Sequence, residues 1–150
     1  MPQSLSSLTF HVIFSTRHRR PLIPVETAGR LYGFIGTILR SQGNRLLLAG
    51  GMPDHLHLLV SLSRNTPIAS TVRDIKANSC RWFRQHHGHG KNSIWQRGYA
   101  AFSVSFSDTE RVRSYIRNQE QHHRKMTFEE ELLRLLRRHD LEFDERYLWD

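Results

Sequence analysis

The sequence predicts an α+β protein with a ferredoxin-like fold, in which a split βαβ arrangement forms an antiparallel sheet and further helices follow at the C-terminus. Two observations carry this prediction. Stretches with strand or helix periodicity occur in the order strand, helix, strand, strand, helix, strand, then helices, which is the order of that fold. The chain has 150 residues, about the length of one domain with a single sizeable core.

The first four elements are indicated by periodicity and by turn residues. Residues 8–16 alternate apolar and mixed side chains, which predicts a strand. Residues 25–42 carry apolar side chains at helical spacing and stop before Gly43, a residue type that commonly ends helices. Residues 44–49 and 55–62 are short apolar runs, and the GGMPD between them is rich in turn-forming residues, so we expect a β-hairpin.

The later elements are a helix, a strand and two further helices. Residues 67–86 combine an apolar stripe with several arginines and predict a helix, and residues 99–105 return to strand-like composition. Residues 107–110 fit a capping box, in which Ser and Glu side chains satisfy free N–H groups of a helix's first turn. Residues 127–130 offer a second box, before a short helix that runs to residue 138.

Composition limits the class of protein and its surroundings. We interpret residues 1–150 as a single domain, with a core over about residues 8–126 and a C-terminal extension over 127–150. The 22 Lys and Arg against 14 Asp and Glu give a net charge of +8, which favours a polyanionic partner. The single cysteine, Cys80, excludes an internal disulfide framework and a multi-cysteine zinc site. Neither a membrane span nor a signal peptide is evident, so we expect a cytoplasmic protein.

Two histidines stand either side of a leucine at the start of the third predicted strand. Residues i and i+2 of a strand share a face, so His55 and His57 would lie side by side with their Cα atoms about 6–7 Å apart. At this distance both imidazoles could hold one metal ion. His11, on the strand expected beside this one, is a candidate further ligand or supporting group. With 10 histidines in the chain, chance pairing is the alternative. The pair His87 and His89 sits among glycines and is a poorer candidate, because backbone freedom would be lost on binding.

Tyr115 and Gln119 lie four residues apart on the helix predicted after residue 110, on a stripe that continues to His123. This spacing puts them on one face, about 6 Å apart along the helix axis. A carboxamide oxygen can supply a third metal ligand, and a phenol one turn away can supply a nucleophile. From these residues alone, a core tyrosine with a hydrogen-bonded neighbour is the alternative.

These motifs together resemble a known family, the single-tyrosine transposases of bacterial insertion sequences, which include the REP-associated tyrosine transposases. The family belongs to the endonucleases named for a His-hydrophobic-His motif. The resemblance covers nearly the whole chain, through HVIFSTRHRRPL, GGMPDHLHLLVSL, WQRGYAAFSVS and VRSYIRNQEQHHRK. It attaches no role to residues 127–150.

The resemblance implies a mechanism and a set of partners. His55 and His57 match the family's metal-binding pair, Tyr115 its nucleophile and Gln119 its third ligand. The implied cofactor is Mg²⁺ or Mn²⁺, and the implied reaction is cleavage and rejoining of hairpin-containing single-stranded DNA through a 5′-phosphotyrosine. A homodimer is also implied, in which the tyrosine helix of one subunit can complete the histidine pair of the other. Such a protein would associate with the nucleoid when bound to DNA.

Basic and aromatic residues are candidates for contacts with DNA. Seven basic residues are interpreted as contacts to the DNA backbone: Arg17, Arg19, Arg20, Arg73, Lys76, Arg81 and Arg84. Trp95 or Tyr99 could stack on unpaired bases. For each of them, a role as an ordinary surface residue is the alternative. Two other functions also stay open. One is a domesticated or non-catalytic hairpin-binding module, and the other is a metal-dependent hydrolase in which water attacks.

Overall fold

The computed structural model describes residues 2–88 and 93–149. Within these residues, the strands form one four-stranded antiparallel sheet in the spatial order β2-β3-β1-β4, the arrangement of a ferredoxin-like fold. The strands are β1 (Thr9–Ser15), β2 (Arg45–Met52), β3 (His55–Ser61) and β4 (Ala100–Val104). The predicted α+β fold class is therefore confirmed.

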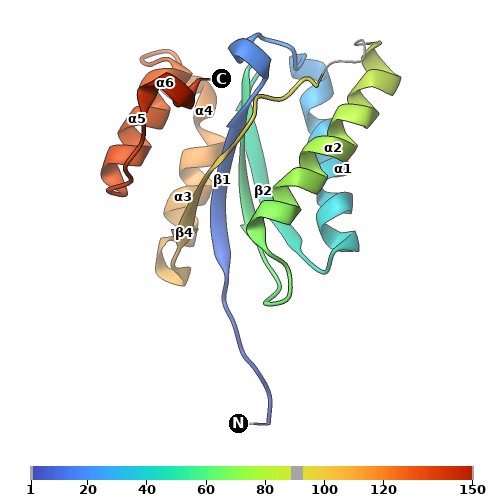
Figure 1. Ribbon diagram of the computed structural model, residues 1–150, viewed down its shortest axis with the longest axis vertical. Coiled ribbons are helices and arrows are strands. Elements are labelled where there is room, and N and C mark those ends of the chain that lie inside the picture. Colours follow the sequence, from blue (N-terminus) through green and yellow to red (C-terminus); the bar gives the residue numbers. More distant parts are fainter. Residues whose placement is uncertain (1, 89–92, 150) are drawn as a thin grey trace.

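Helices cover both faces of the sheet (Figure 1). On one face lie α1 (Val25–Ser41) and α2 (Ile68–His87). On the other side lie α3 (Thr109–Arg117), α4 (Gln119–His122), α5 (Phe128–Arg138) and α6 (Glu145–Leu148). Two short 3-10 segments, η1 (Arg17–Arg19) and η2 (Phe106–Asp108), follow β1 and β4. None of the helices in the described part of the chain has the length and hydropathy that a membrane span requires.

Side chains alternate between the two faces of the central strands. Phe14 of β1 and Leu56 and Leu58 of β3 point into the main core, which α1 and α2 complete. Because successive residues of a strand point to opposite faces, His55 and His57 project to the other side, toward α3, α4 and α5. The alternation predicted for the third strand is thus present, and it leaves two buried histidines on the face away from the main core.

Helix α5 packs on this histidine-bearing face. Phe128, Leu132 and Leu136 form a second buried cluster with Ile13 of β1 and Phe102 of β4. Complete burial of one such side chain contributes roughly 1.5–3 kcal/mol, so several of them hold the helix firmly on the sheet. The sequence suggested no role for residues 127–150. In the structure, helix α5 of this segment covers part of the sheet.

The predicted hairpin turn is wrong in extent. Instead of ending at Ala49, β2 continues to Met52, and Gly50 and Gly51 pair with His57 and Leu56 of β3. The connection is reduced to Pro53 and Asp54. Both glycines are tightly surrounded inside the strand. A Cβ atom on Gly50 would meet Ile116 of the neighbouring helix α3, and one on Gly51 would meet the backbone of His55 and Leu56 in β3.

The predicted start and continuity of the tyrosine helix also need correction. The capping box over residues 107–110 does not form, because α3 begins at Thr109 and its N-cap, Asp108, makes no side-chain capping bond. The Asp108 side chain bonds to Ser105 instead. The helix then breaks at Asn118 (φ −96°, ψ 22°), so α4 is a separate turn. The second predicted box is confirmed, with Thr127 and Glu130 bonding reciprocally at 3.2 Å.

Gly50 is the point at which α3 meets β2. A Cβ atom on this residue would lie 2.7 Å from the carbonyl oxygen of Ile116 and 2.8 Å from its Cγ2. We expect Gly50→Ala to lower the free energy of unfolding by about 1–3 kcal/mol through overpacking, and to shift the helix that carries Tyr115. Thermal unfolding measures this effect.

The matched control is Gly33→Ala in α1, where an added Cβ would meet no atom within 4 Å. This change should be neutral or stabilising, because alanine favours a helix interior over glycine. A Gly50→Ala protein that melts with the wild type would show that α3 does not depend on this close approach.

Candidate active site

His55 and His57 lie at the centre of the site, side by side on β3. Both side chains are fully buried, and their ring centroids lie 5.1 Å apart. Gln119 begins α4 and places its Oε1 atom 3.0 Å from Nε2 of His55. The structure therefore brings together the three residues that the sequence suggested as metal ligands.

Tyr115 of α3 reaches the same cluster. Its ring centroid lies 5.9 Å from that of His57, and its hydroxyl donates a hydrogen bond to Oε2 of Glu131. The Gln119 Nε2 atom donates to the same oxygen at 3.0 Å, so Tyr115 and Gln119 share one partner. The break at Asn118 does not separate them, and all of these groups come from one chain.

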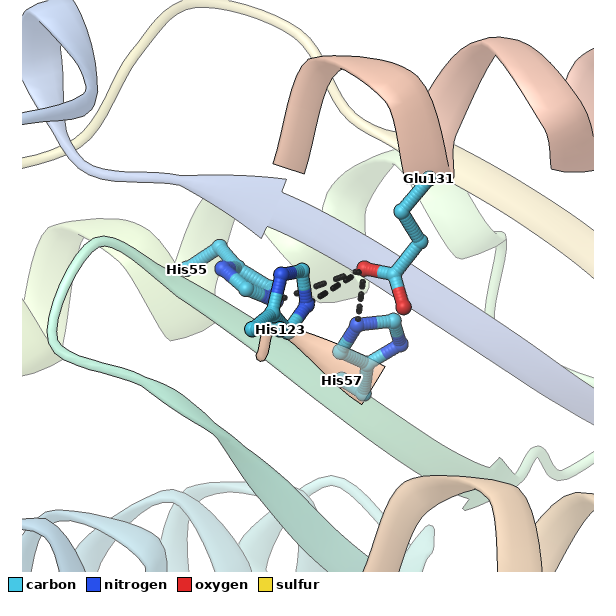
Figure 2. A group of neighbouring side chains, drawn as sticks. All are labelled: His55, His57, His123 and Glu131. Atoms are coloured by element: carbon cyan, nitrogen blue, oxygen red, sulfur yellow. Dashed lines mark hydrogen bonds and ion pairs between the residues drawn. The ribbon is translucent and has the colours of Figure 1, made fainter. Parts of the chain in front are cut away.

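Glu131 is the residue that sequence reasoning missed. It extends from α5 into the histidine cluster, as Figure 2 shows, and its side chain is buried. Its Oε1 atom lies 3.0 Å from Nε2 of His57, 3.2 Å from Nε2 of His123 and 3.4 Å from Nε2 of His55. Each of these four residues offers one ligand atom, and the four atoms all lie within 4.8 Å of one another. A group this compact can hold a metal ion.

One sequence signal did point to Glu131. It occupies the apolar face of α5, three residues after Phe128 and one before Leu132, both of which are buried. A glutamate at a core-facing position is rarely buried unless it is paired. The neighbouring glutamates show the usual behaviour, because Glu130 is exposed and Glu129 pairs with Arg19.

Burial and charge shift the pKa values of the clustered groups in different directions. Burial lowers the pKa of His55, but hydrogen bonds to Asp54 and Glu131 outweigh this effect and raise it to about 9. Burial lowers the pKa of His57. The imidazoles of His123, His55 and His57 hold the pKa of Glu131 far below its usual range despite its burial. The carboxylate is therefore ionised and is compensated by the rings around it.

The hydroxyl of Tyr115 is held in its protonated form. Burial raises the pKa of this phenol above its ordinary value, and the negative charge of Glu131 raises it further. Tyr115 also lines a pocket of about 130 Å³ whose other lining residues include Arg111, Arg138 and His139. The pocket beside Tyr115 is thus bordered by two arginines that the sequence interpretation did not single out.

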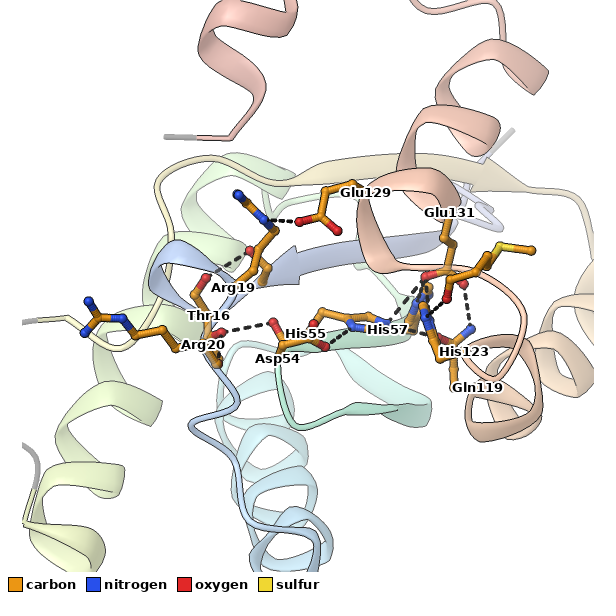
Figure 3. Close-up of polar contacts among 12 residues, drawn as sticks. Thr16, Arg19, Arg20, Asp54, His55, His57, Gln119, His123, Glu129 and Glu131 are labelled. Atoms are coloured by element: carbon orange, nitrogen blue, oxygen red, sulfur yellow. Dashed lines mark hydrogen bonds and ion pairs between the residues drawn. The ribbon is translucent and has the colours of Figure 1, made fainter.

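The basic residues after β1 differ in their surroundings. Arg17 and Arg20 are exposed. Arg19 pairs with Glu129 of α5, as Figure 3 shows, and its guanidinium lies 5.2 Å from the centre of the Trp149 ring. Arg19 therefore helps to hold the C-terminal segment against the body of the protein.

The other basic candidates lie on α2, on the opposite face of the sheet from the histidines. Arg73, Arg81 and Arg84 are exposed there. Lys76 is half-buried, donates to the carbonyl oxygens of Gln96 and Gly98, and has its pKa lowered to about 8 by burial. The structure therefore does not place these four residues at the candidate active site.

Two further sequence suggestions have clear outcomes. Trp95 cannot stack on a DNA base as it stands, because it is buried and its Nε1 donates to Ser79 Oγ at 2.9 Å, so that suggestion was wrong. Tyr99 is 39% exposed and stays available. Of the second histidine pair, His87 packs on Phe83 at the end of α2, and His89 lies outside the described residues.

Comparison with known proteins identifies the family. Residues 4–119 match the family described as "Transposase IS200 like". The chain belongs to the IS200-like transposase family. The matched region includes His55, His57, Tyr115 and Gln119 but ends before His123 and Glu131.

Individual relatives agree with this assignment. The transposase is 26% identical over 117 residues to the ISDra2 transposase TnpA of Deinococcus radiodurans, covering 75% of this chain and 84% of the relative. It is 25% identical over 115 residues to the transposase for insertion sequence element IS200 of Salmonella typhimurium, covering 73% of this chain and 75% of the relative.

Solved structures share the fold. A crystal structure of a candidate transposase from Deinococcus radiodurans superposes with a TM-score of 0.63 at 26% identity, covering 77% of this chain and 93% of the other. A REP-associated tyrosine transposase bound to a REP hairpin superposes with a TM-score of 0.62 at 20% identity, covering 81% of this chain and 71% of the other.

Proposed function

We propose that this transposase cleaves and rejoins single-stranded DNA through a covalent bond between Tyr115 and a 5′-phosphate. The observation that carries the proposal is the position of the Tyr115 hydroxyl. It bonds to the same carboxylate that faces the imidazoles of His55 and His57, so a nucleophile and a cluster of metal ligands meet in one place.

The donors in this place fit a divalent cation. We propose Mg²⁺ or Mn²⁺ as the cofactor, held by His55, His57 and Gln119, whose imidazole nitrogens and amide oxygen suit ions of this class. Such a cation polarises the scissile phosphodiester and offsets the charge that develops on its oxygens. The protein orients the strand and supplies the attacking group.

Tyr115 Oη attacks phosphorus, a Tyr–O–P bond forms, and the bond from phosphorus to the 3′-oxygen of the preceding nucleotide breaks. The departing oxygen takes a proton and becomes a free 3′-OH. An ordinary tyrosine with a pKa of about 10 is ionised at only roughly one part in a thousand at pH 7. The raised pKa of Tyr115 makes that fraction smaller, so loss of the proton has to accompany attack. Oε2 of Glu131 accepts the hydrogen bond from Oη and is placed to receive this proton.

Joining is the reverse of cleavage, and it tests the proposal against simple hydrolysis. A free 3′-OH attacks the phosphotyrosine, one phosphodiester replaces another, and ATP is not needed. Protein carrying a cleaved strand should therefore join it to an added oligonucleotide that ends in 3′-OH. Release of the strand with a 5′-phosphate and no joined product would support attack by water instead.

His11→Leu is expected to weaken cation binding, because it removes the hydrogen-bonding partner that orients His57. Nε2 of His11 lies 2.8 Å from Nδ1 of His57, and burial together with His57 lowers the pKa of His11 to about 3, so this ring is neutral. Loss of such an orienting partner typically weakens metal binding by about 10–100-fold. Calorimetric titration with Mn²⁺ measures it. His11→Gln retains an acceptor and should recover most of the affinity, whereas wild-type binding by His11→Leu would contradict the orienting role.

We propose hairpin-containing single-stranded DNA as the substrate. The net charge of +8 supports a polyanionic partner. Arg17 and Arg20 are exposed after β1, and the exposed Arg111 and Arg138 line the pocket that also contains Tyr115. Each phosphate neutralised on a single strand contributes about −0.7 to the slope of log K against log salt. Hairpin binding should therefore weaken steeply between low and high salt, and a flat response would remove these arginines from the substrate site.

A homodimer is proposed from the resemblance to the family, and one chain already contains Tyr115, Gln119 and both histidines in contact. Mixing Tyr115→Phe subunits with His57→Ala subunits tests exchange of the tyrosine helix between copies. Cleavage that returns on mixing supports a site built from two subunits. Background activity despite confirmed subunit exchange shows that each chain uses its own tyrosine.

A further inference from the structure

We propose that Glu131 and His123 are ligands of the divalent cation together with His55, His57 and Gln119, a proposal that rests on the metal-dependent function above. Both added residues follow position 119, where the match to the family ends. The segment after the family-matched region would then complete the metal site.

Five donor atoms converge on one point. Oε1 of Glu131 lies 3.0–3.4 Å from Nε2 of all three histidines, and Oε1 of Gln119 lies 3.0 Å from Nε2 of both His55 and His123. Ligands of an octahedral ion with bonds of about 2.1 Å are separated by about 3.0 Å along each edge. The observed separations are thus those of ligands around a shared ion.

The far side of each imidazole orients it for this role. Nδ1 of His55 lies 2.7 Å from a carboxylate oxygen of Asp54 (Figure 3). Nδ1 of His57 lies 2.8 Å from Nε2 of His11, and Nδ1 of His123 lies 3.0 Å from the carbonyl oxygen of Met126. Asp54 and the Met126 carbonyl oxygen are acceptors, and the neutral His11 ring can be one. An acceptor at Nδ1 favours the tautomer with its proton there, which leaves the Nε2 lone pair free for a metal.

Gln119 is oriented in the same sense. Its Nε2 atom donates to Oε2 of Glu131 at 3.0 Å. This bond fixes which end of the amide is nitrogen, so the amide oxygen faces the imidazoles. Oε2 of Glu131 also accepts from Tyr115, so its Oε1 is the oxygen that faces the convergence point. All five groups thus present a lone pair to one place.

A simple hydrogen-bond network accounts less well for this arrangement. The Oε1 atom of Glu131 has two lone pairs, yet three imidazole nitrogens face it. Suppose that all three Nε2 atoms carried protons. Each ring that also donates a hydrogen bond from Nδ1 would then be an imidazolium, and three buried positive charges would face one carboxylate. Burial works against such charges, because a charged group that is taken out of water loses its hydration.

This donor set has consequences for the reaction. Three imidazoles favour Mn²⁺ or a similar transition-metal ion over Mg²⁺, which prefers oxygen ligands. Five protein donors leave one position of an octahedron for a phosphate oxygen. Because Oε2 of Glu131 bonds to the Tyr115 hydroxyl, one carboxylate links the cation site to the nucleophile.

Binding of Mn²⁺ without DNA tests the proposal by titration calorimetry. Glu131→Ala should weaken binding by at least about tenfold, because a charged ligand is lost. Glu130→Gln is the matched control, since it changes an exposed glutamate on the same helix to a residue that can still form the capping box. It should bind as the wild type does. Equal affinities of Glu131→Ala and the wild type would overturn the proposal and would leave cleavage by Tyr115 untouched.

A second measurement does not depend on how the variant folds. In crystals of the wild-type protein soaked in Mn²⁺, anomalous scattering locates the ion directly. We expect Oε1 of Glu131 and Nε2 of His123 at about 2.0–2.3 Å from it. An ion held by His55, His57 and Gln119, with Glu131 or His123 turned away, would contradict the proposal.

Discussion

Tyr115→Phe is expected to abolish formation of the covalent protein–DNA adduct while hairpin binding stays within about threefold of the wild type. The ring is retained and keeps its contacts with His11 and His57, with centroids 6.0 and 5.9 Å away. Only the hydroxyl and its bond to Glu131 are lost. Denaturing electrophoresis of the protein with labelled DNA measures the adduct, and a gel-shift titration measures binding.

The matched control is Tyr147→Phe, which makes the same change to an exposed tyrosine on α6. Its adduct yield should equal that of the wild type. Adduct formed by Tyr115→Phe would show that another residue is the nucleophile, and the placement of Tyr115 beside the histidine cluster would then need a structural explanation.

His57→Ala is expected to remove cation-dependent cleavage, reducing the rate by at least about a hundredfold. The substitution deletes a proposed ligand and also leaves Glu131 and His11 without their partner at 3.0 and 2.8 Å. Because His57 is fully buried, circular dichroism and hairpin binding must accompany the activity measurement.

The double variant His87→Ala, His89→Ala is the control for this prediction, since it removes the other His-x-His pair. His87 packs on Phe83 at the end of α2, and no described contact joins it to the cluster on β3. The double variant should cleave like the wild type. If it lost cleavage while His57→Ala kept it, the metal site would belong to the segment that contains His87 and His89.

Local periodicity explains how much of this architecture could be predicted from the sequence. Alternation along residues 55–62 depends only on strand geometry, so it predicts that His55 and His57 share one face. The spacing of Tyr115 and Gln119 likewise brought them to one partner, despite the break at Asn118. Such predictions succeed because neighbours in sequence determine the direction of each side chain.

The missed features depend on distant contacts. Glu131 reaches His57, 74 positions earlier, only because the apolar side of α5 packs on β1 and β4. Gly50 looked like a turn residue and proved to be the place where α3 approaches the sheet. Trp95 and Lys76 looked like surface residues, but tertiary packing buries the indole and ties the ammonium group to backbone carbonyls. No local pattern distinguishes the outcomes for Gly50, Trp95 and Lys76, whereas Glu131 was marked only by its place on the apolar face of α5.

The most direct test of the account uses single-stranded DNA from the sequence that flanks the gene, labelled at one end and incubated with the protein and Mn²⁺. A 5′-phosphotyrosine keeps the downstream fragment on the protein, so a 3′-end label should survive denaturing electrophoresis at the mass of the protein plus that fragment. A 5′-end label should instead appear on a shorter free strand that ends in 3′-OH. Cleavage that leaves both labels on free DNA, or a 5′-end label on the protein, would contradict the proposed mechanism.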